Sequence, residues 1–217
     1  MKFEIIEERY TKKDAPIKFI ENFCINLIQE IKQYYYDLEE NPLKYRERTL
    51  SSVVFPAFMR TGRRAVMEVY YRKNNKRNFL DYYIMDSMGE NSYLVEFKHG
   101  WYDGGNNKII EFNANKWNIV NEQIEKLKNE QECVNEFIDS EKNIYGLSMY
   151  MIVSQSDEKN QFFNYDEHKK IIIEKFEDCE WIFVKKLADE HGLSELDGLY
   201  YLSITLIGKI CEIEKNN

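Results

Sequence analysis

One run of ten residues constrains the fold more than any other part of the chain. Residues 145–154, YGLSMYMIVS, are almost entirely apolar. A strand without alternation of apolar and polar residues is typical of a strand that is covered on both faces. The run therefore predicts an α/β protein whose mixed central sheet is flanked by helices.

The segments around this run divide into helical and strand-like patterns. Apolar residues at helical spacing predict helices at 14–38, from Asn41 onward, at 114–130 and near 165–178. Aromatic and β-branched runs predict strands at 65–71, 79–85, 92–99, 145–154 and 199–212. Pro56 should end or kink the second helix. The order is ααβββαβαβ, and 217 residues without repeats or a linker fit a single domain over 1–217.

Composition narrows the location and the partners of the chain. The N-terminus lacks the apolar core of a signal peptide, and no stretch approaches the roughly 18 apolar residues of a membrane span. The four cysteines are far apart and form no CxxC pair, which favours free thiols in a reducing compartment. We therefore expect a cytoplasmic protein that does not use a membrane.

The charge pattern bears on nucleic-acid binding. A formal net charge of −8 argues against non-specific coating of nucleic acid, because phosphate neutralisation drives such binding. Residues 60–77 nevertheless hold seven basic residues and one acid. They form a solvated hairpin surface or a strip for phosphates. The candidates for phosphate contact are Arg60, Arg63, Arg64, Lys73, Lys76 and Arg77.

The second and third predicted strands bring three charged residues together. The turn at 86–91 has the same midpoint as positions 81 and 96, so a symmetric hairpin places Asp81 directly opposite Glu96. Lys98 follows two residues later and shares their face. Two facing carboxylates destabilise a sheet unless a proton or a cation compensates them. Hard oxygen ligands suit Mg²⁺ or Mn²⁺.

A third carboxylate comes from the second predicted helix. Glu47 lies on the face that also carries Leu43, Leu50, Val54 and Phe58. An acid on an apolar stripe is expensive to bury without a partner. We therefore expect Glu47 to have a role beyond solvation.

This arrangement resembles the PD-(D/E)XK nuclease superfamily, which has a restriction-endonuclease-like αβββαβ core. The resemblance covers about residues 41–153 and rests on YRERTL, on FLDYY and on LVEFKHG, followed by a helix and a strand. It implies that Asp81, Glu96 and the backbone carbonyl of Phe97 bind a metal, with Glu47 as a further ligand or water-positioner. Lys98 would assist the attacking water. Lys116 or Gln123 would match the accessory residue of the following helix, and spacing does not choose between them.

Three functional hypotheses follow. The first is a Mg²⁺- or Mn²⁺-dependent endonuclease that hydrolyses nucleic-acid phosphodiesters, with DNA as the favoured substrate. The second is a catalytically inactive module of the same fold that binds nucleic acid or a protein partner, and a simple ion pair of Lys98 with the two acids is compatible with it. The third is an assembly subunit or homodimer formed through helix 14–38, with Leu27 and Ile31 at the interface.

Overall fold

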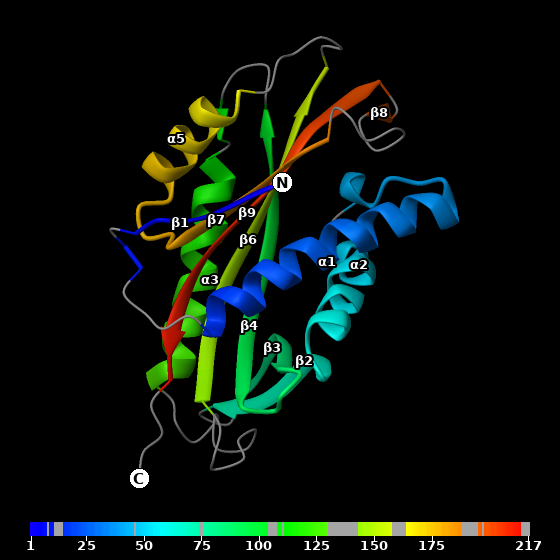
Figure 1. The fold of residues 1–217 in the computed structure, drawn as a ribbon. Coiled ribbons are helices and arrows are strands. Elements are labelled where there is room, and N and C mark those ends of the chain that lie inside the picture. The colour runs from blue at the N-terminus through cyan, green and yellow to red at the C-terminus, as the bar shows by residue number, and fades with distance from the viewer. Residues whose placement is uncertain are drawn as a thin grey trace.

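The computed structural model describes residues 1–7, 9–10, 15–45, 47–73, 76–103, 108–109, 111–129, 143–157, 164–187, 195–196 and 198–213. In this part of the chain, helices cover both faces of one mixed β-sheet (Figure 1). This arrangement confirms the predicted α/β class.

The described helices are α1 (Ala15–Leu38), α2 (Glu47–Thr61), α3 (Glu111–Asn129) and α5 (Tyr165–Lys175), with a 3₁₀ turn η1 (Pro42–Lys44) before α2. The described strands are β1 (Lys2–Ile5), β2 (Arg64–Lys73), β3 (Lys76–Met85), β4 (Asn91–Asp103), β5 (Lys108–Ile109), β6 (Asn143–Ser156), β7 (Trp181–Lys186), β8 (Glu195–Leu196) and β9 (Leu199–Glu212). The strand order is β1-β7-β9-β6-β4-β3-β2, with β5 beside β4 and β8 beside β9. β4 and β6 pair in parallel through the α3 crossover, and the other described pairs are antiparallel.

Strand β6 lies at the centre of the sheet, as its composition predicts. It pairs with β4 on one side and β9 on the other. Every residue from Ile144 to Ser154 is buried. A strand in this position has no solvent face, so its sequence shows no alternation.

A layer of helices packs on each face of the sheet. Helices α1 and α2 pack together on one face, where Phe23 and Phe58 stack with their ring centroids 4.0 Å apart. Helices α3 and α5 lie on the opposite face (Figure 1). Trp117 of α3 and Ile172 of α5 belong to the apolar cluster of that face.

The packing also explains one glycine of β9. A Cβ on Gly208 would lie 2.1 Å from Cζ2 of the Trp181 ring on β7. Only glycine lets this buried tryptophan lie flat against the neighbouring strand.

Four sequence-based predictions are corrected by the structure. The second predicted helix does not start at Asn41: Asn41 caps the 3₁₀ turn η1, Tyr45 after it is extended with a ψ of 165°, and α2 begins at Glu47. Pro56 does not end α2, which continues to Thr61 because its apolar face, which includes Val54 and Phe58, is buried in the core on both sides of the proline. Leu27 and Ile31 are buried within the chain's own core and cannot form a dimer interface. The predicted element order also omits the short strands β1 and β7, which pair with each other and extend the sheet beyond β9.

Candidate functional site

The predicted register of the β3–β4 hairpin is confirmed. The described pairs run from Met85↔Ser92 to Tyr82↔Val95. Asp81 and Glu96 come one step beyond the last of these pairs, so their direct opposition stays a prediction. The turn chemistry that sets this register is local, since Asp86 accepts hydrogen bonds from groups at the end of its own turn.

The backbone pairing of β3 with β4 ends at the acidic residues. Beyond Tyr82↔Val95, the amide N–H of Phe97 donates to Oδ2 of Asp81 at 2.9 Å. The Asp81 side chain thus replaces a backbone carbonyl as the acceptor for this amide. A buried amide needs such a partner, so Asp81 stabilises the point at which the two strands separate.

Glu68, on the edge strand β2, lies at the same level of the sheet as Asp81. It has a φ of +49°, in the left-handed region that costs an ordinary residue about 1–2 kcal/mol. The β2–β3 pairs on either side of it share one register, which places Glu68 opposite Asp81. No motif in the sequence singles out Glu68, although it is the only acid within the basic segment 60–77.

Both strands of the β2–β3 hairpin change faces at this level. Met67 and Tyr82 pack against the core under α1 and α2. Val69 and Leu80, one step beyond Glu68 and Asp81, belong to the apolar cluster under α3. The carboxylate of Asp81 is therefore at the bend of the hairpin, where an irregular backbone coincides with charge, a combination that occurs at functional sites.

Lys98 joins Asp81 to the backbone of β4. Its Nζ donates to Oδ2 of Asp81 at 3.0 Å and to the carbonyl oxygen of Phe97 at 3.2 Å. One cationic group thus lies between a carboxylate and a carbonyl. This is the contact expected of a structural ion pair, and it also shows that these two oxygens converge on a single positive charge.

Glu96 is the most deeply buried carboxylate among the described residues, with 1% of its surface exposed. It lies two residues from Lys98 on β4 and shares its face. Leu94, on the same face, packs with α3, so this face looks toward that helix. A carboxylate at this depth requires a cation, hydrogen-bond donors or a proton.

Helix α3 brings both accessory candidates to this face. Nζ of Lys116 donates to the carbonyl of His99 at 2.8 Å, which ties the helix to β4. Gln123 is seven residues further on, a rise of about 10.5 Å, and three strand residues span about 10 Å in the opposite direction. Gln123 therefore lies near the level of Glu96, and its Oε1 is buried without a hydrogen-bond partner among the described residues. The choice between Gln123 and Lys116 as the accessory residue stays a prediction.

Glu47 is the first residue of α2, and its side chain lies outside the described part of the structure. Leu43, Leu50, Val54 and Phe58, its predicted companions, are fully buried. Leu43 belongs to η1 and not to α2, so only Leu50, Val54 and Phe58 show which stripe of α2 faces the core. Its role as a further acid of the site stays a prediction.

His99 is not part of the charged face. It packs on the opposite side of β4 from Lys98, with its ring 4.8 Å from that of Trp101. Burial, together with the charges of Lys116 and Lys98, lowers the pKa of His99 to about 4, against a smaller opposite effect of the Tyr45 backbone. His99 is therefore neutral near pH 7. The Tyr45 contribution places the segment before α2 beside β4.

The structure describes the side chains of half of the predicted phosphate-binding residues. Arg60, Arg63 and Arg64 are exposed, and Nε of Arg60 contacts Oε1 of Glu30 at 2.5 Å. Lys73, Lys76 and Arg77 have side chains outside the described part of the structure. Arg63 and Arg64 are thus available to an anion at the start of β2.

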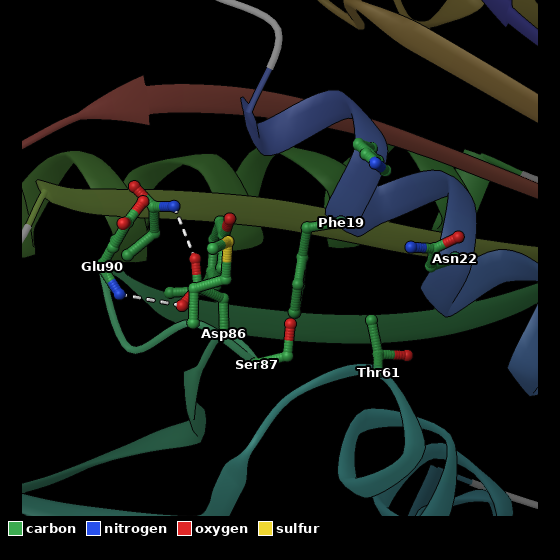
Figure 2. A pocket seen from close by; sticks show the side chains of 10 residues that line it. Phe19, Asn22, Thr61, Asp86, Ser87 and Glu90 are labelled. Carbon is green, nitrogen blue, oxygen red and sulfur yellow. Dashed lines mark hydrogen bonds between the residues drawn. The ribbon is translucent and has the colours of Figure 1, made fainter.

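A pocket of about 370 Å³ lies between the first turns of α1, the end of α2 and the β3–β4 turn (Figure 2). Asp86 projects at its edge and accepts from the amide of Glu90 at 3.0 Å and from Nδ2 of Asn91 at 2.6 Å. Tyr93, another lining residue, is three residues from Glu96 and on the opposite face of β4. The pocket is therefore separate from the acidic residues of β3 and β4.

The oxygen donors of the site fit a hard cation. Oδ2 of Asp81 and the Phe97 carbonyl already converge on the ammonium of Lys98, and Glu96 is the neighbouring acid. Within the residues that the structure describes, no three His, Cys, Asp or Glu side chains gather closely enough to hold a metal. A three-acid site would need Glu47, and a two-acid site would use the Phe97 carbonyl as its third oxygen.

Comparison with known proteins adds no assignment: no family model, curated protein or solved structure matches the chain. The chemistry of the site therefore rests on the residues described above. None of the helices in the described ranges is long and apolar enough to cross a bilayer.

Proposed function

We propose that the chain is a Mg²⁺- or Mn²⁺-dependent endonuclease of the PD-(D/E)XK type that hydrolyses phosphodiester bonds, with DNA as its substrate. One observation carries the proposal. The carboxylate of Asp81 and the carbonyl of Phe97 converge on one cationic group, beside the deeply buried acid Glu96. The order α2-β2-β3-β4-α3-β6 supports it, because this is the order of the superfamily's core.

Each residue of the site has a role in this proposal. Asp81, Glu96 and the Phe97 carbonyl would hold the metal, and Glu47 would add a ligand or position a water. When bound, the metal supplies Lewis acidity toward phosphate and water. With the metal in place, the ammonium of Lys98 would be released from Asp81 and would stabilise the attacking water and the charge that develops on the phosphate.

The positions around the metal site complete the proposal. Gln123 lies near the level of Glu96, where its amide would orient that carboxylate or the water. Arg63 and Arg64, at the start of β2, would neutralise phosphates on one side of the cleaved bond. The net charge of −8 is compatible with this role because residues 60–77, with seven basic residues and one acid, carry a local net charge of +6.

Metal binding is the first test, since it does not depend on finding the right substrate. Calorimetric titration with Mn²⁺ should show binding to the wild type and its loss in Glu96→Gln. Lys98→Met should bind Mn²⁺ several-fold more tightly, because the competing ammonium is gone. Glu122→Gln, a change at an exposed acid of α3, is the matched control and should bind like the wild type. Equal binding by the wild type and Glu96→Gln would remove the site.

Cleavage is the second test. Plasmid and oligonucleotide DNA should be cut by the wild type with Mn²⁺, whereas Glu96→Gln and Lys98→Met should be inactive. The Lys98 variant separates the roles, because it retains metal binding and loses activity. A Lys98→Met protein that cuts like the wild type would contradict the role assigned to this lysine.

A catalytically inactive binding module is the second candidate. The observation that favours it is the contact of Lys98 with Asp81 and Phe97, which neutralises the carboxylate by itself. This candidate predicts DNA or partner binding without Mn²⁺ binding. The titration described above therefore separates the two functions.

A further inference from the structure

Two aromatic side chains are exposed side by side on the β2–β3 hairpin. Tyr70 and Phe79 are directly opposite each other in the register, and their ring centroids are 5.8 Å apart. Tyr70 is 38% exposed and Phe79 is 54% exposed. Large rings usually contribute to a core or an interface, so an exposed pair on neighbouring strands points to a binding surface.

The bend at Glu68 explains why these rings face outward. Beyond the bend, Val69 and Leu80 turn toward the apolar cluster under α3. Because side chains alternate along a strand, Tyr70 and Phe79 project from the opposite face. The backbone irregularity beside Asp81 thus also presents the rings.

The ring pair borders the proposed active site. Phe79 is two residues from Asp81 on β3, a distance of about 7 Å along the strand. β2 is an edge strand of the sheet and lies at the opposite edge from β1 (Figure 1). The rings are thus close to Asp81 along β3, but they project away from the α3 side of the sheet, on which Glu96 and Lys98 lie.

The charge of the hairpin segment indicates which kind of ligand would bind to the rings. Seven basic residues and one acid in residues 60–77 give this hairpin segment a net charge of +6, in a chain of net charge −8. Pairing of two copies through β2 would bring two such segments together, which like-charge repulsion opposes. A nucleic-acid strand offers both phosphates for the basic residues and flat bases for the rings.

We propose that Tyr70 and Phe79 form a stacking platform for unpaired nucleobases, and that the ligand of this surface is a single-stranded nucleic-acid segment. Together with the proposed nuclease activity, on which this second step rests, the platform assigns the substrate class: DNA with an unpaired segment. Sequence-independent stacking of this kind needs no hydrogen-bond readout of the bases.

Binding of a single strand tests the platform without any cleavage. Fluorescence anisotropy in EDTA compares an oligothymidylate of about twenty nucleotides with an abasic strand of the same length and charge. We expect the thymidylate to bind about tenfold more tightly, because stacking of one base contributes roughly that factor. The Tyr70→Ala/Phe79→Ala variant should lose this preference, and Tyr70→Phe should keep it because the ring remains.

Val66→Ala is the matched control. Val66 is also on β2 and is 50% exposed, but it lies before the bend. Its removal should leave the preference for thymidylate unchanged. Thermal unfolding of each variant shows whether the fold is retained, and substitution of exposed rings should change Tm little.

Four results would overturn the platform. The first is equal binding of the thymidylate and abasic strands, and the second is an unchanged preference in the double alanine variant. The third is binding of a blunt duplex as tightly as of the single strand. The fourth is sedimentation of the wild type as a dimer and of the double alanine variant as a monomer. The proposed nuclease fails separately. Ring-dependent binding with no metal-dependent cleavage would support the platform and remove the nuclease. Glu96-dependent cleavage that ignores both rings would do the reverse.

Discussion

His168 offers a quantitative test of the packing between α5 and the sheet. Its side chain is 3% exposed, its Nε2 lies 2.8 Å from Oγ1 of Thr205, and its ring meets that of Tyr102 edge-on. Burial lowers the pKa of His168 to about 4. The folded protein therefore holds this imidazole neutral at pH values where the unfolded chain protonates it.

The sign and the size of the effect follow from linkage. Because folding lowers the pKa of His168, the contribution of its neutral, buried imidazole to the free energy of unfolding is fully present above the pKa of about 6.5 in the unfolded chain. It is lost as the pH falls from there to about 4. The difference of about 2.5 pH units corresponds to about 3 kcal/mol at the acid end.

Urea unfolding between pH 7.5 and pH 4.5 measures this term. His168→Gln removes the titrating group and leaves an amide that can still bond to Thr205. The free energy of unfolding of the wild type should fall by about 2–3 kcal/mol more than that of the variant over this range. His99, whose pKa is also lowered to about 4, is present in both proteins and cancels in the difference. Parallel pH profiles for the two proteins would refute the reasoning.

Two further predictions concern close contacts in the sheet. Gly208→Ala should destabilise the protein by about 1–3 kcal/mol in urea unfolding, because its methyl group would overlap the Trp181 ring; an unchanged midpoint would show that the ring moves freely. Asp81→Ala should be less stable than Asp81→Asn by about 1 kcal/mol, because only asparagine keeps an acceptor for the amide of Phe97. Hydrogen exchange at that amide should be faster in the alanine variant, and equal exchange in the two variants would contradict the role given to the Asp81 side chain.

Local patterns predict those parts of the fold that depend on neighbours in sequence. The β3–β4 register follows from a short turn that is symmetric about its centre, and the central position of β6 follows from the absence of a polar face. The same patterns fail where long-range packing decides. Pro56 lies within a helix because its apolar neighbours are held in the core, and β1 is too short to be recognised without its partner β7.

The site shows the same division. Alternation along β4 and the hairpin register are enough to predict that Asp81, Glu96 and Lys98 share a face. Spacing along α3 is not enough to choose between Lys116 and Gln123, because the choice depends on where the helix packs along the length of β4. The contact of Lys116 with the His99 carbonyl fixes one point of α3 against β4, and the choice between the two residues stays a prediction.

The sequence by itself determined the α/β class, the central strand and the register of the β3–β4 hairpin, because each depends on a period or a turn only a few residues long. Only the tertiary structure decided that the β2–β3 hairpin bends at Glu68, that Lys98 lies between Asp81 and the Phe97 carbonyl, and that Tyr70 and Phe79 face outward. These features arise where β3 leaves β4. The positions of the strands there depend on how two layers of helices pack against opposite faces of the sheet. No pattern within a few residues of sequence specifies this packing.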